Sequence, residues 1–267
     1  MRLEKYHGLG NDFLVLVDLD GSQPVDAGLA RAVCDRHEGV GADGLIRVTA
    51  GHGRPGGADV VMELWNADGS RAETSGNGLR CVARAVVDAG VVTRPELVIA
   101  TDAGPRRATV DGGMVTVGMG EVAVVERTGQ WDDLGPDDAH WSEFVDAGNP
   151  HVVFGVDDVG KVDLEQYGRA WDHHYPGGIN VEYVTVGPGE DELTMRVWER
   201  GVGETRACGS GACAVAVAAE RHVGLVGGGR VTVHQPGGDA VVDLSGDTVL
   251  LSGPAAHVFT ADVEARK

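Results

Sequence analysis

Apolar residues along the 267-residue chain alternate with polar ones, or gather in short continuous runs, at many points in both halves. Runs of about four to eight such residues, bounded by glycine and charged residues, are typical of β-strands. They fall at 12–18, 45–48, 59–65, 96–100 and 114–118, and again at 151–156, 179–186, 193–199, 230–235, 239–244 and 247–252. The pattern predicts β-sheet in each half of the chain.

Apolar residues recur at helical spacing in the segments between these runs. A helix is predicted over 26–37, with Asp26 as its N-cap, and a second over 76–90, which follows a glycine-rich turn. The second half repeats the series with helices at 163–172 and 209–223. Both halves are therefore predicted to be mixed α/β (α+β), each with one long helix that begins at a glycine-rich turn.

The similarity between the halves extends to single residues. When "LWNADGSRAETSGNGLRCVARAV" is set beside "VWERGVGETRACGSGACAVAVAA", Trp65 aligns with Trp198 and Ser75 with Cys208. A second pair of stretches begins at Asn11 and Asn149. Two echoes in the same order predict an internal duplication with pseudo-twofold symmetry. We expect an N-terminal half over 1–117 that carries Ser75 and a C-terminal half over 118–267 that carries Cys208.

Composition excludes several classes of partner. There are 22 lysines and arginines against 41 acidic residues, which gives a formal charge of −19 without any acidic block. Nucleic acids and anionic membranes require a positive surface, so neither is an expected partner. No apolar stretch reaches the length of a membrane span or of a signal peptide, so we expect a cytoplasmic protein. The four cysteines lack the spacing of a metal site or a disulfide scaffold.

The two glycine-rich helix starts suggest a chemistry. Each presents free backbone N–H groups and a positive dipole end, and a pair of them aimed at one cleft would bind an anion. If that anion is the carboxylate of an amino acid, the same donors stabilise the charge that develops when the α-proton leaves, without a pyridoxal cofactor. Such a reaction needs a base on one face of the α-carbon and an acid on the other.

A cysteine at a helix start suits that role. The helix N-terminus is expected to lower the pKa of a thiol there, so that Cys208 could exchange a proton near neutral pH. Cys208 precedes two glycines and stands outside the apolar periodicity, which favours a functional thiol. Cys34, Cys81 and Cys213 lie inside the predicted helices and are expected to be core residues.

Six stretches of the chain, in order, resemble the diaminopimelate epimerase family and together extend over nearly its whole length. They are "HGLGNDFLV" (7–15), "CDRHEGVGADGL" (34–45), "NADGSRAETSGNGLRC" (66–81), "GNPHVV" (148–153), "GINVEYV" (178–184) and "ERGVGETRACGSGACA" (199–214). The resemblance implies a duplicated two-domain fold. Each half would be a barrel-like sheet around a central helix, with the active site in the cleft between the halves and the C-terminal strand near 254–267 packed on the first half.

The resemblance also implies an activity. Enzymes of this family interconvert LL- and meso-diaminopimelate, a small-molecule substrate, for lysine and peptidoglycan biosynthesis, and they use neither cofactor nor metal. By family analogy the chain would form a homodimer. The substrate's reacting end would lie against Gly76, Asn77, Gly209 and Ser210. Its distal end would be held by Asn66, Asn149, Asn180, Glu199 and Arg200, with Asn11 lining the site and His151 as an assisting residue.

One residue departs from the family pattern. The family has a cysteine before the first Gly-Asn-Gly, where this chain has Ser75, and a hydroxyl is a far weaker acid than a thiol. The catalytic pair would then be Cys208 and Ser75, with an activity impaired or altered by the serine. The alternatives are a homologue that binds a diamino acid with slow or no turnover, an engineered Cys-to-Ser variant, and another amino-acid epimerase or a phenazine-type isomerase on the same scaffold.

Overall fold

The structure is a computed structural model that describes residues 1–54, 56–72, 75–126, 134–224 and 229–264. The chain divides into two compact units. The first comprises Met1–Gly118 together with the segment that starts at Gly253, and the second comprises Met119–Ser252. Among the described residues, no helix is both long and apolar enough to cross a membrane.

Strands of the first unit form a mixed sheet. β2 pairs with β3 and β4 pairs with β6 in parallel, whereas β1–β2, β3–β4, β4–β5, β6–β7, β7–β8 and β1–β18 are antiparallel. The bounds are β1 Arg2–Gly8, β2 Asn11–Val17, β3 Gly44–Ala50, β4 Val60–Asn66, β5 Arg71–Ala72, β6 Glu96–Thr101, β7 Gly104–Asp111, β8 Met114–Gly120 and β18 Ala256–Asp262.

The second unit repeats this topology. β11–β12 and β13–β15 are parallel, and β9–β10, β10–β11, β12–β13, β13–β14, β15–β16 and β16–β17 are antiparallel. The bounds are β9 Ala123–Val124, β10 Trp141–Asp146, β11 Pro150–Gly155, β12 Asn180–Val186, β13 Glu192–Glu199, β14 Gly203–Thr205, β15 Arg230–Gln235, β16 Gly238–Asp243 and β17 Val249–Pro254. Each pairing has a counterpart in the first unit, so the predicted duplication is confirmed.

The register of the strands agrees with the alignment of the two halves. Trp65 on β4 lies opposite Leu45 on β3, and Trp198 on β13 lies opposite Val181 on β12. Both tryptophans thus occupy the same position in equivalent strand pairs. The equivalence extends to the neighbouring strands, where Phe13 lies opposite Gly44 and His151 lies opposite Asn180.

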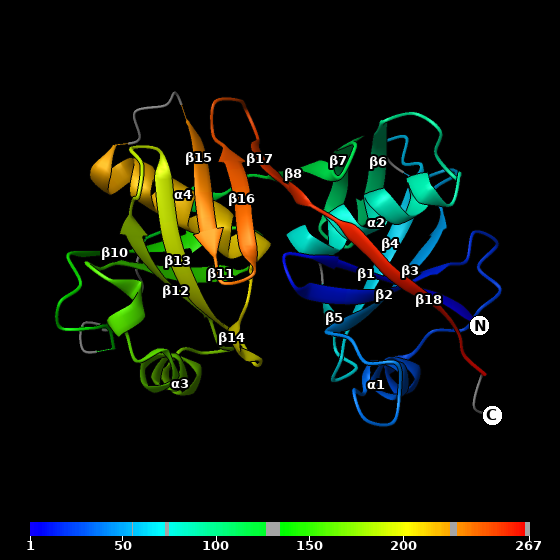
Figure 1. Ribbon diagram of the computed structural model, residues 1–267, viewed down its shortest axis with the longest axis horizontal. Coiled ribbons are helices and arrows are strands. Elements are labelled where there is room, and N and C mark those ends of the chain that lie inside the picture. The colour runs from blue at the N-terminus through cyan, green and yellow to red at the C-terminus, as the bar shows by residue number, and fades with distance from the viewer. Residues whose placement is uncertain (55, 73–74, 127–133, 225–228, 265–267) are drawn as a thin grey trace. The chain divides into compact units, whose positions relative to one another are not determined.

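Each sheet curves around one long helix, α2 (Gly76–Asp88) in the first unit and α4 (Gly209–Val223) in the second (Figure 1). α2 contacts seven strands of its own unit, β1, β2, β3, β4, β6, β7 and β18. α4 likewise contacts β9, β10, β11, β12, β13, β15 and β16. A helix enclosed in this way must be apolar on nearly every side. The alanines and valines of α4 meet that need, since Ala212 to Ala216 are all fully buried.

Shorter helices cover the outside of each sheet. α1 (Ala27–Cys34) packs on β3 and β4, and Asp26 caps it by accepting a hydrogen bond from the Leu29 amide. α3 (Leu164–His174), preceded by the 3₁₀ turn η1 (Val159–Lys161), packs on β12, β13 and β14. The predicted core cysteines are confirmed, because Cys34, Cys81 and Cys213 are 0–2% exposed.

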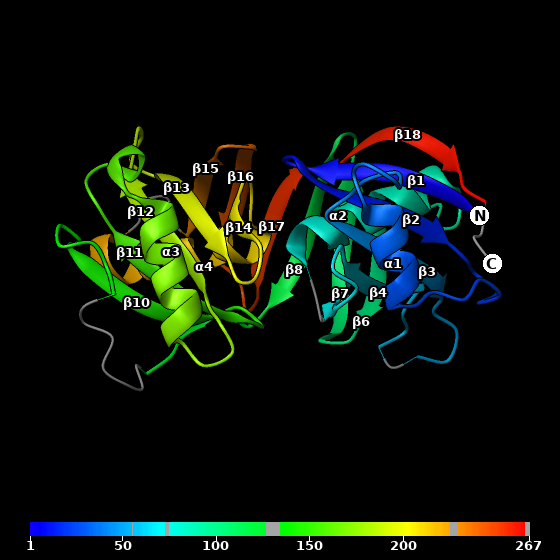
Figure 2. The same ribbon diagram turned by 90° about the horizontal axis from the view of Figure 1, so that it is seen from below.

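Strands β1 and β7 were not predicted from the sequence, because charged residues interrupt their apolar positions. β1 (RLEKYHG) carries charges at Arg2, Glu4 and Lys5, and β7 (GPRRATVD) carries two successive arginines and Asp111. β18 pairs antiparallel with β1 from Arg2↔Asp262 to His7↔Ala256, as Figure 2 shows at the edge of the first unit. Its side chains are exposed except at Ala261, and it is the C-terminal strand that the family resemblance assigned to the first half.

Candidate active site

Helix α2 begins at the serine that departs from the family pattern. The Gly78 amide donates to Ser75 Oγ at 3.1 Å, so Ser75 is an N-cap. A Cβ on Gly78 would lie 3.0 Å from Met62 Cε and 3.3 Å from Ile46 Cδ1. The first turn of the helix therefore rests on hydrocarbon, and glycine at this position lets the backbone approach it closely.

Polar side chains of the first unit hold this turn in a chain of hydrogen bonds. Arg80, which is fully buried, donates to Asn77 Oδ1 at 2.7 Å, and Asn77 Nδ2 donates to Asn11 Oδ1 at 3.1 Å. Asn11 Nδ2 in turn donates to Asp43 Oδ2 at 2.8 Å. Two residues predicted to bind substrate, Asn11 and Asn77, thus touch each other, whereas Arg80 and Asp43 were not predicted.

Asp43 also connects Asn66 to this group. Asn66 ends β4 opposite Gly44 on β3, and its Nδ2 donates to Ser70 Oγ at 3.0 Å. The Ala67 amide, next in the chain, donates to the Asp43 carbonyl at 3.0 Å. The predicted asparagines of the first half therefore come together at the end of the sheet where α2 begins.

Helix α4 begins in the same way with a sulfur in place of the hydroxyl. The Gly211 amide donates to Cys208 Sγ at 3.3 Å, and the Cys208 amide donates to Gln235 Oε1 at 2.8 Å. Ser210 Oγ lies 3.5 Å from the sulfur. Cys208 is only 5% exposed, so the thiol sits in the floor of the turn. Ser75 and Cys208 are thus N-caps in equivalent positions.

The expected lowering of the Cys208 pKa is wrong. Burial, together with the negative charges of Glu199 and Glu182, raises the pKa of this thiol well above its ordinary value, although the Ser210 hydroxyl and the Gly211 amide lower it. Desolvation and two like charges outweigh the helix N-terminus, since both disfavour the thiolate. Sequence spacing revealed the helix start but not the carboxylates behind it.

The remaining residues predicted in the second half lie near this turn. Asn180 Oδ1 accepts a hydrogen bond from the Arg200 amide at 3.0 Å, and Asn180 Nδ2 donates to the Pro150 carbonyl at 3.0 Å. Glu199, at the end of β13, accepts a hydrogen bond from Thr205 Oγ1. The Asn180 side chain thus connects the backbone of the segment that carries Arg200 to the backbone of the segment that carries Asn149.

His151 is fully buried between two oxygens. Its Nε2 lies 2.9 Å from Asn149 Oδ1, and its Nδ1 lies 2.7 Å from Glu182 Oε1, a carboxylate that is also 0% exposed. Glu182 was not predicted from the sequence, although a signal existed. In "NVEYV" the glutamate shares a strand face with Asn180, two residues before it, and so points to the same side as a predicted site residue.

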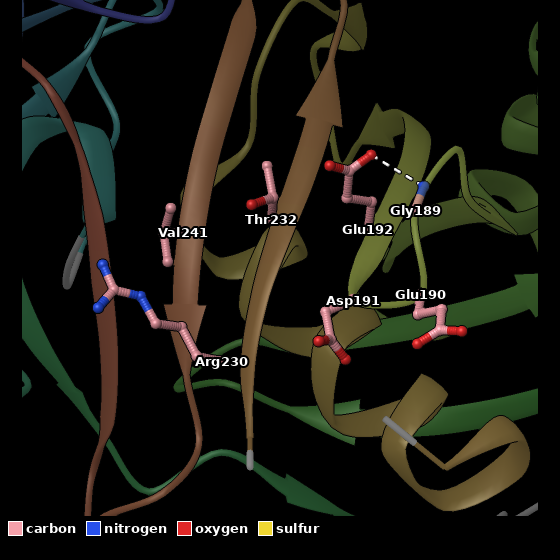
Figure 3. A pocket seen from close by; sticks show the side chains of 7 residues that line it. All are labelled: Gly189, Glu190, Asp191, Glu192, Arg230, Thr232 and Val241. Atoms are coloured by element: carbon pink, nitrogen blue, oxygen red, sulfur yellow. Dashed lines mark hydrogen bonds between the residues drawn. The ribbon is translucent and has the colours of Figure 1, made fainter. Parts of the chain in front are cut away.

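A pocket of about 620 Å³ opens elsewhere on the second unit, at the start of β13. Figure 3 shows the Gly189 amide bonded to Glu192, while the Arg230 side chain extends beside Val241 and away from Glu190. Asp191 and Thr232 complete the lining. None of these residues belongs to the predicted site, whose members in this unit lie toward the other end of β13. The volume of this pocket therefore does not identify the candidate active site.

Each unit thus contains the same kinds of functional group at the start of its long helix. A buried glycine-rich first turn supplies backbone N–H donors, its N-cap side chain carries an exchangeable proton, and asparagines stand beside it. Such a turn can bind a carboxylate and stabilise negative charge next to it. Within the described residues, no group of three or more His, Cys, Asp and Glu side chains could hold a metal ion.

Comparisons of the whole chain with known proteins agree with this geometry. The model of the family described as diaminopimelate epimerase matches residues 3–125 and 143–258. The diaminopimelate epimerase of Zymomonas mobilis is 39% identical over 276 residues, which cover 97% of this chain and 96% of that protein. That of Desulfitobacterium hafniense is 41% identical over 284 residues, with 97% and 96% covered.

Solved structures share the fold at much lower identity. A phenazine biosynthesis protein of the PhzF family from Bacillus anthracis has a TM-score of 0.77 at 16% identity, with 99% of each chain covered. A hydroxyproline epimerase from Agrobacterium vitis has a TM-score of 0.76 at 15% identity, with 98% of this chain and 91% of that chain covered. The fold is thus common to several proteins, whereas the sequence match is specific: the chain belongs to the diaminopimelate epimerase family.

Proposed function

We propose that this protein interconverts LL- and meso-diaminopimelate by moving a proton at the α-carbon, as a cytoplasmic enzyme of lysine and peptidoglycan biosynthesis. The observation that carries the proposal is the pair of equivalent helix starts, each with a proton-bearing N-cap, in a chain of this family. The relatives named above are diaminopimelate epimerases, and the residues of both turns suit a carboxylate substrate.

In the proposed reaction the two N-caps act on opposite faces of the α-carbon. One, in its deprotonated form, takes the α-proton, and the backbone N–H groups of Gly76, Asn77, Gly209 and Ser210 stabilise the negative charge that spreads onto the substrate carboxylate. The other N-cap then donates a proton from the opposite face and inverts the centre. Cys208 is the stronger acid of the two, and Ser75 takes the place at which the family has a second thiol.

The distal amino-carboxylate end is assigned to Asn66, Asn149, Asn180, Glu199 and Arg200, with Asn11 lining the site. Arg200 offers two parallel donors to a carboxylate, and Glu199 and the amide oxygens can accept from an ammonium group. His151 is fully buried, so we assign it the role of orienting Asn149 rather than of touching substrate. No cofactor or metal has a part in this mechanism.

Ser75 favours a second candidate. A serine hydroxyl is a poor base for an α-proton, so the chain could bind a diamino acid and turn it over slowly or not at all. A natural homologue of altered activity and a deliberate Cys-to-Ser change would both look like this. Other epimerisations on the same scaffold are less favoured, because the asparagines, Glu199 and Arg200 of the predicted distal site are all present.

Exchange of the α-proton in deuterated water separates these candidates. LL- and meso-diaminopimelate are incubated separately with the protein and with Ser75→Cys, and deuterium at the α-carbon is followed by NMR. We expect slow or one-sided exchange that Ser75→Cys raises strongly. Equally fast exchange from both isomers without the change would contradict the limiting role of Ser75. Binding without exchange would favour the second candidate, and absence of binding would reject the substrate.

We also propose that the protein forms a homodimer, with no nucleic acid or membrane partner. Strand β18 supports this, because Val258 and Phe259 on it are 51% and 41% exposed. An exposed strand with apolar side chains is a surface that proteins usually cover. Light scattering should give twice the chain mass, and Phe259→Glu should shift it toward the monomer. A monomeric mass at all concentrations would reject the dimer.

A further inference from the structure

A buried carboxylate lies beneath the first turn of α4. Glu182, on β12, is 0% exposed, and one of its oxygens is 2.7 Å from His151 Nδ1. The other oxygen, Oε2, is also buried and has no hydrogen-bond partner among the described residues. An ionised carboxylate is costly to bury with one oxygen unpaired, so a structural role alone does not account for it.

Glu182 reaches the immediate surroundings of the Cys208 thiol. A Cβ placed on Gly211 would lie 2.6 Å from Glu182 Oε1 and 3.3 Å from Cys208 Sγ. Carboxylate and sulfur therefore approach the same point from two sides, and Gly211 leaves that point empty. Any larger residue at position 211 would separate them.

The equivalent positions in the described part of the first unit hold uncharged side chains. Phe13 lies opposite Gly44, as His151 lies opposite Asn180, and Ile46 and Glu182 each follow two residues later. The pair Phe13 and Ile46 thus corresponds to His151 and Glu182. Among the described residues at these equivalent positions, only those beneath the thiol are an acid and a histidine.

The groups around Cys208 come from four elements. Glu182 on β12 and Glu199 on β13 carry negative charge, and His151 on β11 can carry positive charge. The Ser210 hydroxyl and the Gly211 amide on α4 are donors to the sulfur. Burial and the two carboxylates dominate, and they raise the pKa of the thiol. Without the charge of Glu182 the thiolate would form at lower pH.

We propose that Glu182 is a positioning residue that, together with burial and Glu199, keeps Cys208 in its protonated form at neutral pH and at the same time fixes the His151 ring. In the free protein Cys208 therefore rests as a thiol, the form that donates a proton. The inference rests on the proposed function only for its catalytic meaning. The protonation state itself is a property of the free protein.

The test measures that state directly. The native protein and Glu182→Gln are treated with iodoacetamide across a pH series, and alkylation of Cys208 is followed site by site by mass spectrometry. In the native protein the midpoint should lie above about 8.5, the ordinary value for a thiol. In Glu182→Gln it should fall by about one pH unit, because the anion that opposes the thiolate is gone. The rate near neutral pH should rise up to about tenfold.

Two further variants serve as controls. Glu182→Asp keeps the charge and should keep a high midpoint, while Glu190→Gln removes an exposed carboxylate near the other end of β13 and should change nothing. An unchanged midpoint in folded Glu182→Gln would overturn the proposal. That is the result expected if a positive charge on His151 cancels the negative charge of Glu182. A native midpoint at or below the ordinary value would also overturn it and needs no variant to fold. Because no substrate is present, these results stand apart from any failure to epimerise diaminopimelate.

Discussion

The first turns of α2 and α4 have the same backbone geometry, but the side chains that lie beneath them differ in charge. In each, an N-cap side chain accepts a hydrogen bond from a glycine amide three residues later. Beneath Ser75 lie the hydrocarbon ends of Met62 and Ile46, whereas beneath Cys208 lies the carboxylate of Glu182. The duplication thus preserved the geometry that binds an anion and let the chemistry below it diverge.

The difference shows where acid and base strength is set. Both N-caps lie at the positive end of a helix dipole. The dipole does not decide the pKa of Cys208, because burial and nearby carboxylates act more strongly. Among the described residues, the side chains beneath the first turn at Ser75 are those of Met62 and Ile46, which are uncharged.

Removal of the thiol should have the largest effect. Cys208→Ala eliminates the stronger acid of the proposed pair, and α-proton exchange of diaminopimelate should fall by about 10²–10⁴-fold. Cys213→Ala, one helical turn further along α4, is the control, since it removes a buried thiol from the core and should cost stability but not exchange. Equal losses in both variants would mean that Cys208 matters only for packing.

Replacement of Glu182 by isoleucine, the residue of the other unit, should destabilise the fold. His151 then keeps its buried position without a charged partner, and breaking such a pair costs about 3–5 kcal/mol in the free energy of unfolding. Adding His151→Phe copies Phe13 and Ile46 of the first unit and should restore most of that stability. Urea denaturation of both single variants and of the double variant measures the coupling. If the losses in the free energy of unfolding of the two single variants simply add in the double variant, the pair Phe13 and Ile46 cannot replace the pair His151 and Glu182.

The two cap glycines should respond differently to alanine. In Gly211→Ala the new methyl meets Glu182 Oε1, which His151 pins in place, and overpacking should cost about 1–3 kcal/mol. In Gly78→Ala it meets the flexible end of Met62, and the higher helix propensity of alanine offsets about 1 kcal/mol of the cost. Thermal denaturation of the two variants should rank them in this order. The reverse ranking would show that the first unit is the tighter one.

The smallest effect is expected from the cap at Ser75. Ser75→Ala removes the acceptor of the Gly78 amide and should cost about 1 kcal/mol of stability, which Ser75→Asp should recover. Both variants are compared by urea denaturation, and their α-proton exchange is recorded at the same time. If Ser75→Ala exchanges as well as the native protein, Ser75 is a cap and has no part in the proton transfer.

Local patterns were sufficient to predict much of this fold. Every predicted helix is present, and Ser75, Asp26 and Cys208 cap three of them, because capping depends on residues only a few positions apart. The duplication could be read from Trp65 and Trp198, since large residues at fixed offsets from a glycine turn survive divergence. Strands β1 and β7 could not be predicted, because charged residues interrupt their apolar pattern, whereas the C-terminal strand β18 was expected only from the family resemblance.

In the candidate site, too, some residues could be predicted from the sequence and others could not. Asn11, Asn77, Asn149 and Cys208 were predicted from motifs, and the structure places the first two in contact with each other and Asn149 in contact with His151. Arg80, Asp43 and Gln235, which hold these residues from behind, were missed because each comes from a distant part of the chain or from within an apolar run. No spacing rule connects a buried partner to the side chain that it orients.

The sequence by itself determined the element types, the duplication, the family and the proton-bearing residue at each helix start, because all of these depend on short-range pattern. Only the tertiary structure decided how acidic Cys208 is. That property depends on desolvation and on the charges of Glu182 and Glu199, which reach the thiol across neighbouring strands. Electrostatic interactions act through space over a few ångströms, so residues 9 to 26 positions away in sequence can outweigh the local helix dipole.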